Sequence, residues 1–348
     1  MAYTTISKST DYFNPVSYTG NGASDRAVTS GFATDFVWIK NRNTTDDHVI
    51  FDKVRGGTKY VYTNSTQAES TYSSLDLTFE NTGVDVGSYT TINNNGSGII
   101  SYHWLANGAG SANTAGSINS TATSANTTAG FSIVKYTGNQ TAGATVGHGL
   151  GSVPKMIIVK NLNDSENWVV YHNKLGNTDG LYLNTNDSTV GTNTFWNNTT
   201  PTTTLFTLGT HDRVNNVNIP YIAYCFAEKT GYSKFGKYIG NGNADGTFIY
   251  TGFKPAFIML KNSSSSGTNW FMHDAARNPS NPIGYYLTAD NNTADQTTDL
   301  LDITSNGFKQ RNSYANLNGS GDTYIYMAFA EEPLVANSGT DGVPATAR

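Results

Sequence analysis

The chain has 348 residues, which is too long for one ordinary domain and suits three units of about 100 residues that can each bury a core. Only 14% of the residues are charged, the net charge is −5, and Lys and Arg are scattered, which excludes a basic face for nucleic acid or anionic membranes. The 21 Tyr and 16 Phe, together with frequent Thr, Asn, Ser and Gly, favour strands and turns over helices.

Residues 1–12 are a short polar arm, which we expect to dock on another protein. This start has no apolar core of the length that a signal peptide needs. The chain has no apolar run long enough to span a bilayer, so we expect no membrane insertion. One cysteine, Cys225, excludes an intramolecular disulfide framework, and we interpret it as a tightly packed strand side chain.

The same pattern of opening strand, Gly-rich turn and apolar run occurs three times along the chain. The opening strands lead into YTGN at Tyr18, YTGN at Tyr136 and YIGN at Tyr238. The apolar runs that follow are FVWIKN at 36–41, MIIVKN at 156–161 and FIMLKN at 257–262. Copies about 100 residues apart indicate a repeat of whole domains rather than a solenoid, whose periods are about 20–50 residues.

Three more runs match in each copy, so the internal similarity extends over whole units. They occupy 48–52, 168–172 and 270–274, then 60–64, 181–184 and 285–288, and finally 100–106, 222–227 and 325–330. Short runs separated by Gly-Asn, Asn-Gly and Asp-Gly turns favour an antiparallel sandwich over a barrel. We therefore predict an all-β protein with three tandem antiparallel β-sandwich units, jelly-roll or lectin-like, at 13–106, 129–230 and 231–333.

Two segments outside these units contain few large apolar side chains. Residues 107–128 are almost wholly Asn, Gly, Ser, Ala and Thr, and we interpret them as a flexible linker or as a strip laid on another surface. Only residues 228–231 separate the second and third units, so we expect those two units to pack closely. Residues 334–348 are a polar tail, which we expect to be extended.

The alternation within the runs predicts which side chains form the core. In the run at 36–40 and in its equivalents, the side chains at both odd and even positions are apolar, which is typical of a strand covered on both faces. Trp104, Phe226 and Phe329 occupy equivalent positions in the closing runs of the three units and so form one structural column. We expect these three rings to be buried.

The sequence contains no recognisable catalytic, cofactor or metal motif. The six histidines form no HxxH or HxxxH pair, and there is no Cys/His cluster, Gly-x-Ser-x-Gly elbow or Walker loop. Residues 241–246 resemble the start of a calcium loop, but Gly252 stands where a bidentate Glu is required, and a turn explains the loop equally well. A pair of carboxylates from distant loops, as in a glycosidase, stays open.

Aromatic residues in polar surroundings are the candidate contacts for a receptor or glycan. Phe195 and Trp196 lie in an Asn/Thr-rich insertion outside the repeated runs, where an exposed aromatic pair could bind a ligand. Anchoring of this loop is the alternative interpretation. Tyr72 and Tyr314, which lie between the repeated runs, are the weaker candidates.

Several long runs resemble a repeated-domain family found in tail-fibre and other structural proteins of marine bacteriophages. They include DFVWIKNR, AGATVGHGLGSVPKMIIVKN and GYSKFGKYIGNGNADGTFIYTGFKPAFIMLKN, and the resemblance covers about residues 12–333. The ending VPATAR is also similar to the C-termini of such proteins. The resemblance implies a virion component that is lectin-like, and it supplies no catalytic residue.

These observations lead to one main functional expectation. We expect a non-enzymatic virion structural protein, on a tail fibre or tail tip, that binds a host-surface receptor or glycan. The alternatives are a capsid decoration (head fibre) protein and a polysaccharide depolymerase. The expected partners are other virion proteins and further copies of the chain, with a trimer favoured because a closed assembly covers sheet edges. Such a protein would be made in the host cytoplasm and released by lysis.

Overall fold

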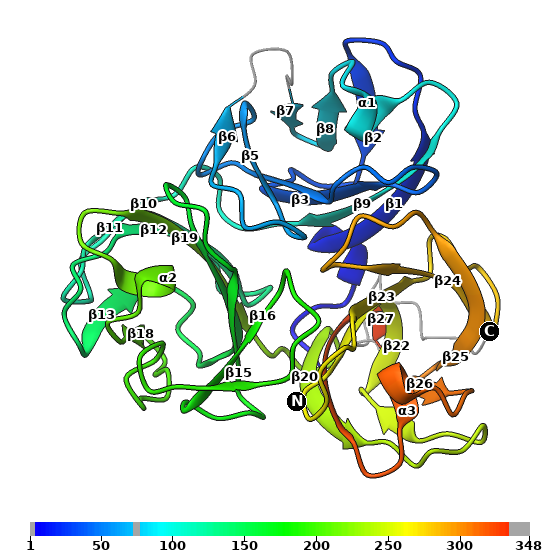
Figure 1. Ribbon diagram of the computed structural model, residues 1–348. Coiled ribbons are helices and arrows are strands. Elements are labelled where there is room, and N and C mark those ends of the chain that lie inside the picture. Colours follow the sequence, from blue (N-terminus) through cyan, green and yellow to red (C-terminus); the bar gives the residue numbers. More distant parts are fainter. Residues whose placement is uncertain (1–3, 72–76, 334–348) are drawn as a thin grey trace.

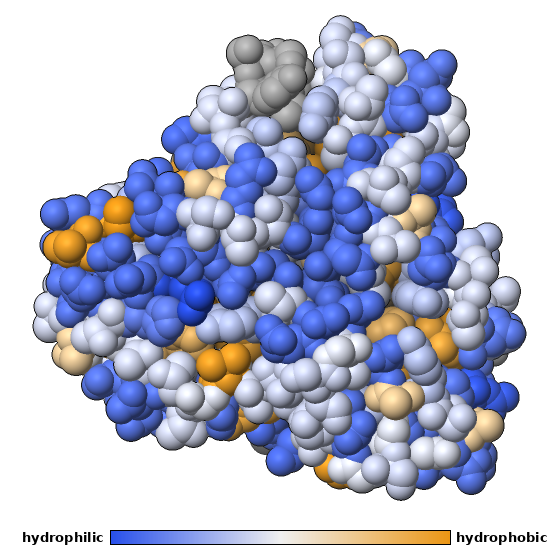
Figure 2. Space-filling model, viewed as in Figure 1, coloured by the Kyte–Doolittle hydropathy of each residue, from blue (hydrophilic) through white to orange (hydrophobic). Residues whose placement is uncertain are grey.

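The computed structural model describes residues 4–71 and 77–333, which form three lobes around a common centre (Figure 1). Strands account for 46% of the residues and helices for 5%, so the predicted all-β class is confirmed, with several antiparallel sheets. We call residues 13–106, 129–230 and 231–333 repeats 1, 2 and 3. On the face drawn in Figure 2, hydrophilic residues dominate and hydrophobic patches are small and separate. The large apolar side chains therefore lie mainly inside.

Repeat 1 contains a large and a small sheet. Its elements are β1 (Phe13–Thr19), β2 (Arg26–Thr29), β3 (Phe36–Asn41), β4 (Val49–Asp52), β5 (Lys59–Tyr62), β6 (Ser70–Thr71), β7 (Leu77–Glu80), β8 (Gly83–Val86), α1 (Thr90–Asn93) and β9 (Gly98–Trp104). The six-stranded sheet has the order β1-β9-β3-β4-β5-β6, and the three-stranded sheet has the order β2-β8-β7. The closing strand β9 therefore lies in the middle of the repeat, between the opening strand and the first long apolar run.

Residues 107–128 belong to the sheet of repeat 2, so a flexible linker is the wrong interpretation of this segment. They contain β10 (Ser111–Asn113) and β11 (Ser120–Asn126). Strand β11 pairs with β12 (Phe131–Thr137), which satisfies its backbone without large apolar side chains. The small hydroxyl groups bond to each other, as in the 2.7 Å contact between Ser120 Oγ and Thr123 Oγ1. The alternative interpretation, a strip laid on another surface, describes the segment correctly.

Repeat 2 contains an eight-stranded and a two-stranded sheet. After β12, its elements are β13 (Ala144–Gly147), β14 (Pro154–Asn161), β15 (Val169–His172), β16 (Asp179–Tyr182), β17 (Val190–Gly191), β18 (Leu205–Leu208), α2 (Asp212–Asn215) and β19 (Pro220–Ala227). The strand orders are β10-β11-β12-β19-β14-β15-β16-β17 and β13-β18. The order around the closing strand is the same as in repeat 1.

Repeat 3 contains one continuous eight-stranded sheet. Its elements are β20 (Ser233–Ile239), β21 (Phe248–Tyr250), β22 (Phe253–Asn262), β23 (Trp270–Asp274), β24 (Ile283–Thr288), β25 (Gln296–Thr304), β26 (Gly307–Gln310), α3 (Ala315–Asn318) and β27 (Thr323–Pro333). The order is β20-β27-β22-β23-β24-β25-β26-β21. The long strand β25 joins the parts that form separate sheets in the other repeats.

The N-terminal arm packs against its own chain rather than standing free. The 3-10 helix η1 (Ser9–Asp11) contacts β1 and β27. Ile6 is only 1% exposed and belongs to the central apolar cluster. Our expectation that residues 1–12 dock on another protein is therefore wrong for Ile6 and η1. The predicted extended tail at 334–348 lies outside the described residues.

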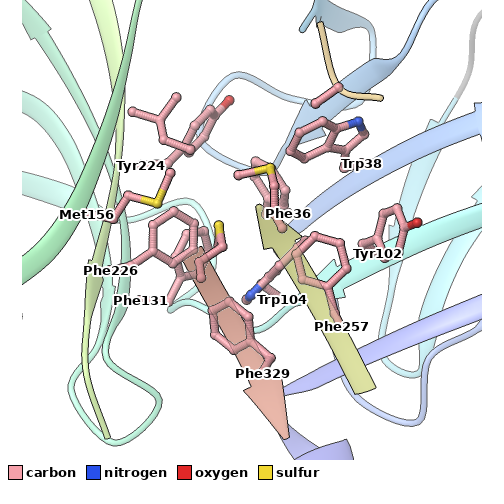
Figure 3. Packing of buried hydrophobic residues seen from close by; sticks show 14 of the residues in the cluster. Phe36, Trp38, Tyr102, Trp104, Phe131, Met156, Tyr224, Phe226, Phe257 and Phe329 are labelled. Carbon is pink, nitrogen blue, oxygen red and sulfur yellow. The ribbon is translucent and has the colours of Figure 1, made fainter. Parts of the chain in front are cut away.

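One apolar core is shared by all three repeats. It is centred on Trp104, Phe226 and Phe329, whose ring centroids lie 5.5 to 6.3 Å apart (Figure 3). All three rings are at most 3% exposed, which confirms the predicted column. We expected each unit to bury its own core, but the large sheets of the three repeats pack their inner faces against one another. This shared face is why the units form a single body.

The opposite face of each large sheet packs against a second cluster that belongs to one repeat. In β3, Phe36 and Trp38 face the shared core, whereas Val37 and Ile39 join the outer cluster of repeat 1. Repeats 2 and 3 have corresponding outer clusters. The prediction of strands covered on both faces is thus confirmed.

The repeated Tyr-x-Gly-Asn motif has a structural role. Its tyrosine hydroxyl donates to a carbonyl oxygen at the short helix before the closing strand, in the pairs Tyr18 to Ile92, Tyr136 to Val214 and Tyr238 to Leu317, at 2.6 to 2.7 Å. The motif asparagine then donates its backbone N–H to the side chain of Asn93, Asn215 or Asn318. The motif therefore ties the opening strand to the helix and marks the fold rather than a binding site.

Candidate functional site

Two of the three contacts between repeats contain the same buried polar triad. Between repeats 1 and 2, the Tyr224 hydroxyl donates to Asp52 Oδ2 at 2.8 Å, and Arg55 Nε donates to the same oxygen at 2.5 Å. Between repeats 3 and 1, Tyr102, Asp274 and Arg277 repeat this arrangement at 2.9 and 2.6 Å. These buried carboxylates are fully paired, so they hold repeats together and are not free for catalysis.

The third contact replaces every member of this triad. His172 stands at the position of the aspartates, and Leu175 stands where the arginine would be. Met327 takes the place of the tyrosine and cannot donate a hydrogen bond. His172 Nε2 instead donates to the Tyr326 carbonyl at 3.2 Å, while Leu175 packs against the shared core. All three replacements together keep the buried groups satisfied.

The strongest predicted contact residues, Phe195 and Trp196, are not on the surface. Their exposed fractions are 0% and 1%, and both belong to the outer cluster of repeat 2. The Phe195 ring packs on His211 at 4.8 Å, and the Trp196 ring packs on Tyr171 at 5.6 Å. The prediction of an exposed receptor contact is wrong here, because the polar loop folds its aromatic pair inward. Anchoring of the loop is the correct interpretation.

The weaker candidates have different outcomes. Tyr314 is 48% exposed at the start of α3, and its ring lies 6.2 Å from Phe271. It stays a candidate contact. Tyr72 lies outside the described residues.

Two other sequence hypotheses concern Cys225 and the loop at 241–246. Cys225 is fully buried, and burial raises the pKa of its thiol to about 12, so it is an inert packing residue as predicted. In the loop, Asn243 Oδ1 accepts the Asp245 N–H, and the Asp245 carboxylate pairs with Lys309 at 2.8 Å. Internal bonds thus explain the loop as a turn. Within 4–71 and 77–333 no cluster of three His, Cys, Asp or Glu side chains could hold a metal ion.

An open cleft in repeat 3 is the best candidate binding site. It has a volume of about 530 Å3, which is within the range of small-molecule sites. The cleft is formed by the loop between β23 and β24, the start of β24 and the facing part of β25. Its lining residues are Arg277, Asn278, Pro279, Ser280, Pro282, Gly284, Tyr285, Thr297, Thr298 and Asp299.

Tyr285 gives this cleft an aromatic surface held in place from a neighbouring repeat. Its side chain is 39% exposed, and the Arg42 guanidinium of repeat 1 lies 5.3 Å from the ring centroid. Arg42 is itself fixed by Asp295 at 2.5 Å, and Asp295 also pairs with the buried Arg277 at 2.6 Å. The ring is therefore positioned by an ion network that continues into the contact between repeats 3 and 1.

The remaining lining groups offer hydrogen bonds to a ligand. Asp299 and the hydroxyl residues Thr297 and Ser280 are exposed. Asn278 is already used, because its side chain bonds to the backbone of Gly284 and Tyr285 and fixes the shape of the loop. A Cβ at Gly284 would lie 3.2 Å from Asp299 Oδ1, so glycine leaves room for this carboxylate. An aromatic ring beside a carboxylate and hydroxyls is suited to the faces and edges of a sugar.

The other two repeats lack this aromatic position. Lys59 in β5 and Asp179 in β16 stand where repeat 3 has Tyr285, as judged from the strand pairings. Our sequence interpretation missed Tyr285 because it lies inside a repeated run, whereas the candidate contacts were sought outside and between these runs. The signal in the sequence was that the equivalent residues, Lys59 and Asp179, are polar, which indicates that the position of Tyr285 lies at the outer end of the strand.

Three lysines with strongly lowered pKa values do not line the cleft and have structural explanations. Burial lowers the pKa of Lys40, Lys160 and Lys261 to about 8. Their ammonium groups donate to backbone carbonyls, such as Lys160 to Thr66 in repeat 1 at 2.8 Å. Lys160 and Lys261 connect loops of different repeats, whereas Lys40 bonds within repeat 1. All three are fully engaged, so they are not candidate bases.

The fold and the cleft define an all-β protein built from a triplicated unit with one shared core and a polar, aromatic surface cleft. A family model described as a domain of unknown function, DUF7483, matches residues 8–333. The chain belongs to this family, and one family domain spans all three repeats. No curated protein and no solved structure matches the chain. In the part of the chain that the structure describes, no helix is long and apolar enough to cross a membrane.

Proposed function

We propose that this protein is a non-enzymatic structural component of a bacteriophage particle that binds a host-surface glycan through the cleft of repeat 3. The observation that carries the binding role is Tyr285, an exposed ring that Arg42 holds from another repeat. The virion role rests on the resemblance of the long repeated runs to phage structural proteins. A tail fibre or tail tip is the proposed location, because a receptor-binding cleft must face the host.

The finer classification of the fold is part of this proposal. Each repeat is best described as a β-sandwich of lectin-like type, since each large sheet covers an outer cluster with strands of its own repeat. The free outer strands β1 and β20 end their sheets. Symmetric assembly of several chains, with a trimer favoured, would cover such edges in the particle.

The lining of the cleft supports binding without hydrolysis. Glycoside cleavage uses two carboxylates that flank the bond, about 5–10 Å apart. Among the lining residues, Asp299 is the only carboxylate, and the nearby Asp295 is occupied by two arginines. A bound sugar would therefore stack and form hydrogen bonds without an acid and base pair acting on it.

Antibody labelling of particles by electron microscopy tests the virion role. We expect label at the tail fibre or tail tip, and we expect purified protein to compete with phage adsorption to host cells. Label confined to the head would favour the alternative capsid decoration role. Label absent from particles would contradict the virion proposal altogether.

A further inference from the structure

Strand β21 of repeat 3 ends its sheet with apolar side chains exposed. Phe248 and Tyr250 are 46% and 54% exposed, while Ile249 between them is buried. Ile239 is 51% exposed and lies close by, since the Thr247 hydroxyl donates to its carbonyl oxygen at 2.9 Å. In the described parts of the chain, β26 is the only strand that pairs with β21. An apolar free edge of this kind is typical of a surface that another strand covers.

The equivalent edge in repeat 2 is already covered. Strand β13 pairs with β18 through Val146 and Phe206, as β21 pairs with β26 through Ile249 and Phe308. This register makes Phe248 equivalent to Thr145 and Tyr250 equivalent to Gly147.

Residues 116–118 of the preceding segment lie on the outer side of β13. Ile118 donates its N–H to the Thr145 carbonyl at 2.9 Å, in a parallel bridge. Ser117 and Thr145 exchange two further bonds at 2.9 Å, from each backbone N–H to the other side-chain oxygen. A Cβ at Gly116 would lie 2.3 Å from the Thr145 oxygen, so glycine allows this close approach. The fold therefore accepts a short segment in a parallel bridge at this edge.

Repeat 3 has the same edge with different side chains. Because hydrogen-bonding directions alternate along a strand, the Phe248 carbonyl and the Tyr250 N–H point outward, as the Thr145 carbonyl does in repeat 2. Aromatic side chains replace Thr145 and Gly147, so the backbone N–H at the position of Ser117 would lose its side-chain acceptor, and a hydroxyl there would keep only the backbone N–H of Phe248 as a partner. An apolar residue there would instead cover Phe248.

We propose that the outer edge of β21 binds an extended strand of another polypeptide, parallel to β21, by β-strand addition. The strand that β21 binds should carry a glycine at the position of Gly116, an apolar residue at the position of Ser117 and a β-branched residue at the position of Ile118. A second copy of β21, related by a twofold axis, would pair antiparallel, which differs from the parallel segment that repeat 2 accepts. A heterologous strand is therefore the occupant that the fold favours.

Synthetic peptides of residues 111–120 test this proposal with amide hydrogen exchange on the full chain. The peptide with Ser117→Leu should slow exchange in β21 at least about tenfold at saturation. The same peptide with an added Gly116→Val change is the matched control and should give no protection. In the protein variant Phe248→Thr, which recreates the residue of repeat 2, the preference should change to the unaltered Ser117 peptide.

Three results would overturn the proposal. One is β21 exchange that neither peptide slows in the wild-type protein. Another is slow exchange of β21 in the full chain without any peptide, if this protection is lost on truncation after Pro333. That result would make residues 334–348 the occupant. The third is protection that increases with protein concentration, which would indicate pairing of two copies. An unchanged melting temperature of Phe248→Thr verifies that the variant folds.

Discussion

Replacing Phe329 by alanine should destabilise all three repeats rather than repeat 3 alone. The Phe329 ring lies at the centre of the shared core and is 1% exposed. Its centroid is 4.9 Å from Phe13, 5.5 Å from Trp104 and 6.1 Å from Phe226, so its neighbours come from repeats 1 and 2 as well. Removing a fully buried phenylalanine side chain costs about 3–5 kcal/mol of unfolding free energy. We expect the cost here to be near the upper end, because sheets on every side limit collapse around the cavity.

Chemical denaturation combined with amide hydrogen exchange measures this effect repeat by repeat. Phe308→Ala is the matched control, because Phe308 is fully buried in the outer cluster of repeat 3. Both variants should lose similar free energy. Only Phe329→Ala should lower protection in β9 and β19 to the same extent as in β27.

Loss of protection confined to repeat 3 in Phe329→Ala would refute the shared core. It would mean that the repeats unfold as separate domains and that their inner faces contribute little to one another. An equal loss of protection in β9, β19 and β27 for both variants would instead mean that the outer cluster of repeat 3 unfolds together with the shared core.

Three further predictions follow from the buried polar groups and the loop of repeat 2. Tyr102→Phe should cost about 1.5–3 kcal/mol in denaturant unfolding, because it removes a hydrogen bond to the buried Asp274 carboxylate. Tyr232→Phe should be near neutral, since the Tyr232 hydroxyl has no hydrogen-bond partner in the described structure; equal costs would contradict the role of the triad. Acid should destabilise the fold, because burial lowers the pKa of His103 and His273 to about 3 and that of His172 to about 4. The unfolded state then binds more protons below about pH 6.5, and at pH 5 each histidine should cost about 2 kcal/mol. Burial raises the pKa of Asp290 to about 6, so protonation of Asp290 favours the fold in acid, but by less than the three histidines disfavour it. Equal denaturation midpoints at pH 7.5 and pH 5 would contradict this prediction of acid destabilisation. Trp196→Ala should lower stability by about 3–5 kcal/mol, and a melting temperature equal to wild type would show that this ring is not a loop anchor.

The repeated runs were sufficient to predict the all-β class and the column of core rings. Trp104, Phe226 and Phe329 hold matching places in sequence, and strand periodicity determines which face each one occupies. The shared core could not be predicted in the same way, because periodicity shows that a face is buried but not what it packs against. Phe36 has the same pattern whether it faces its own repeat or another one.

Segments with polar composition were the main source of wrong interpretations. Residues 107–128 form strands because backbone pairing and small hydroxyl contacts, such as Ser120 with Thr123, replace apolar burial. Phe195 and Trp196 turn inward although their neighbours in sequence are polar. The binding cleft was missed for the opposite reason, because Tyr285 belongs to an apolar run but lies beyond the edge of the core.

Binding of purified protein to host-surface polysaccharide is the most direct test of the proposed function. The wild-type protein should bind the polysaccharide without releasing sugars, and Tyr285→Ala should weaken binding at least about tenfold, which corresponds to 1.4 kcal/mol. Tyr250→Ala, which removes an exposed ring outside the cleft lining, should bind like the wild type. Equal binding by wild type and Tyr285→Ala would contradict the cleft as the glycan site, and release of sugars would contradict a non-enzymatic role.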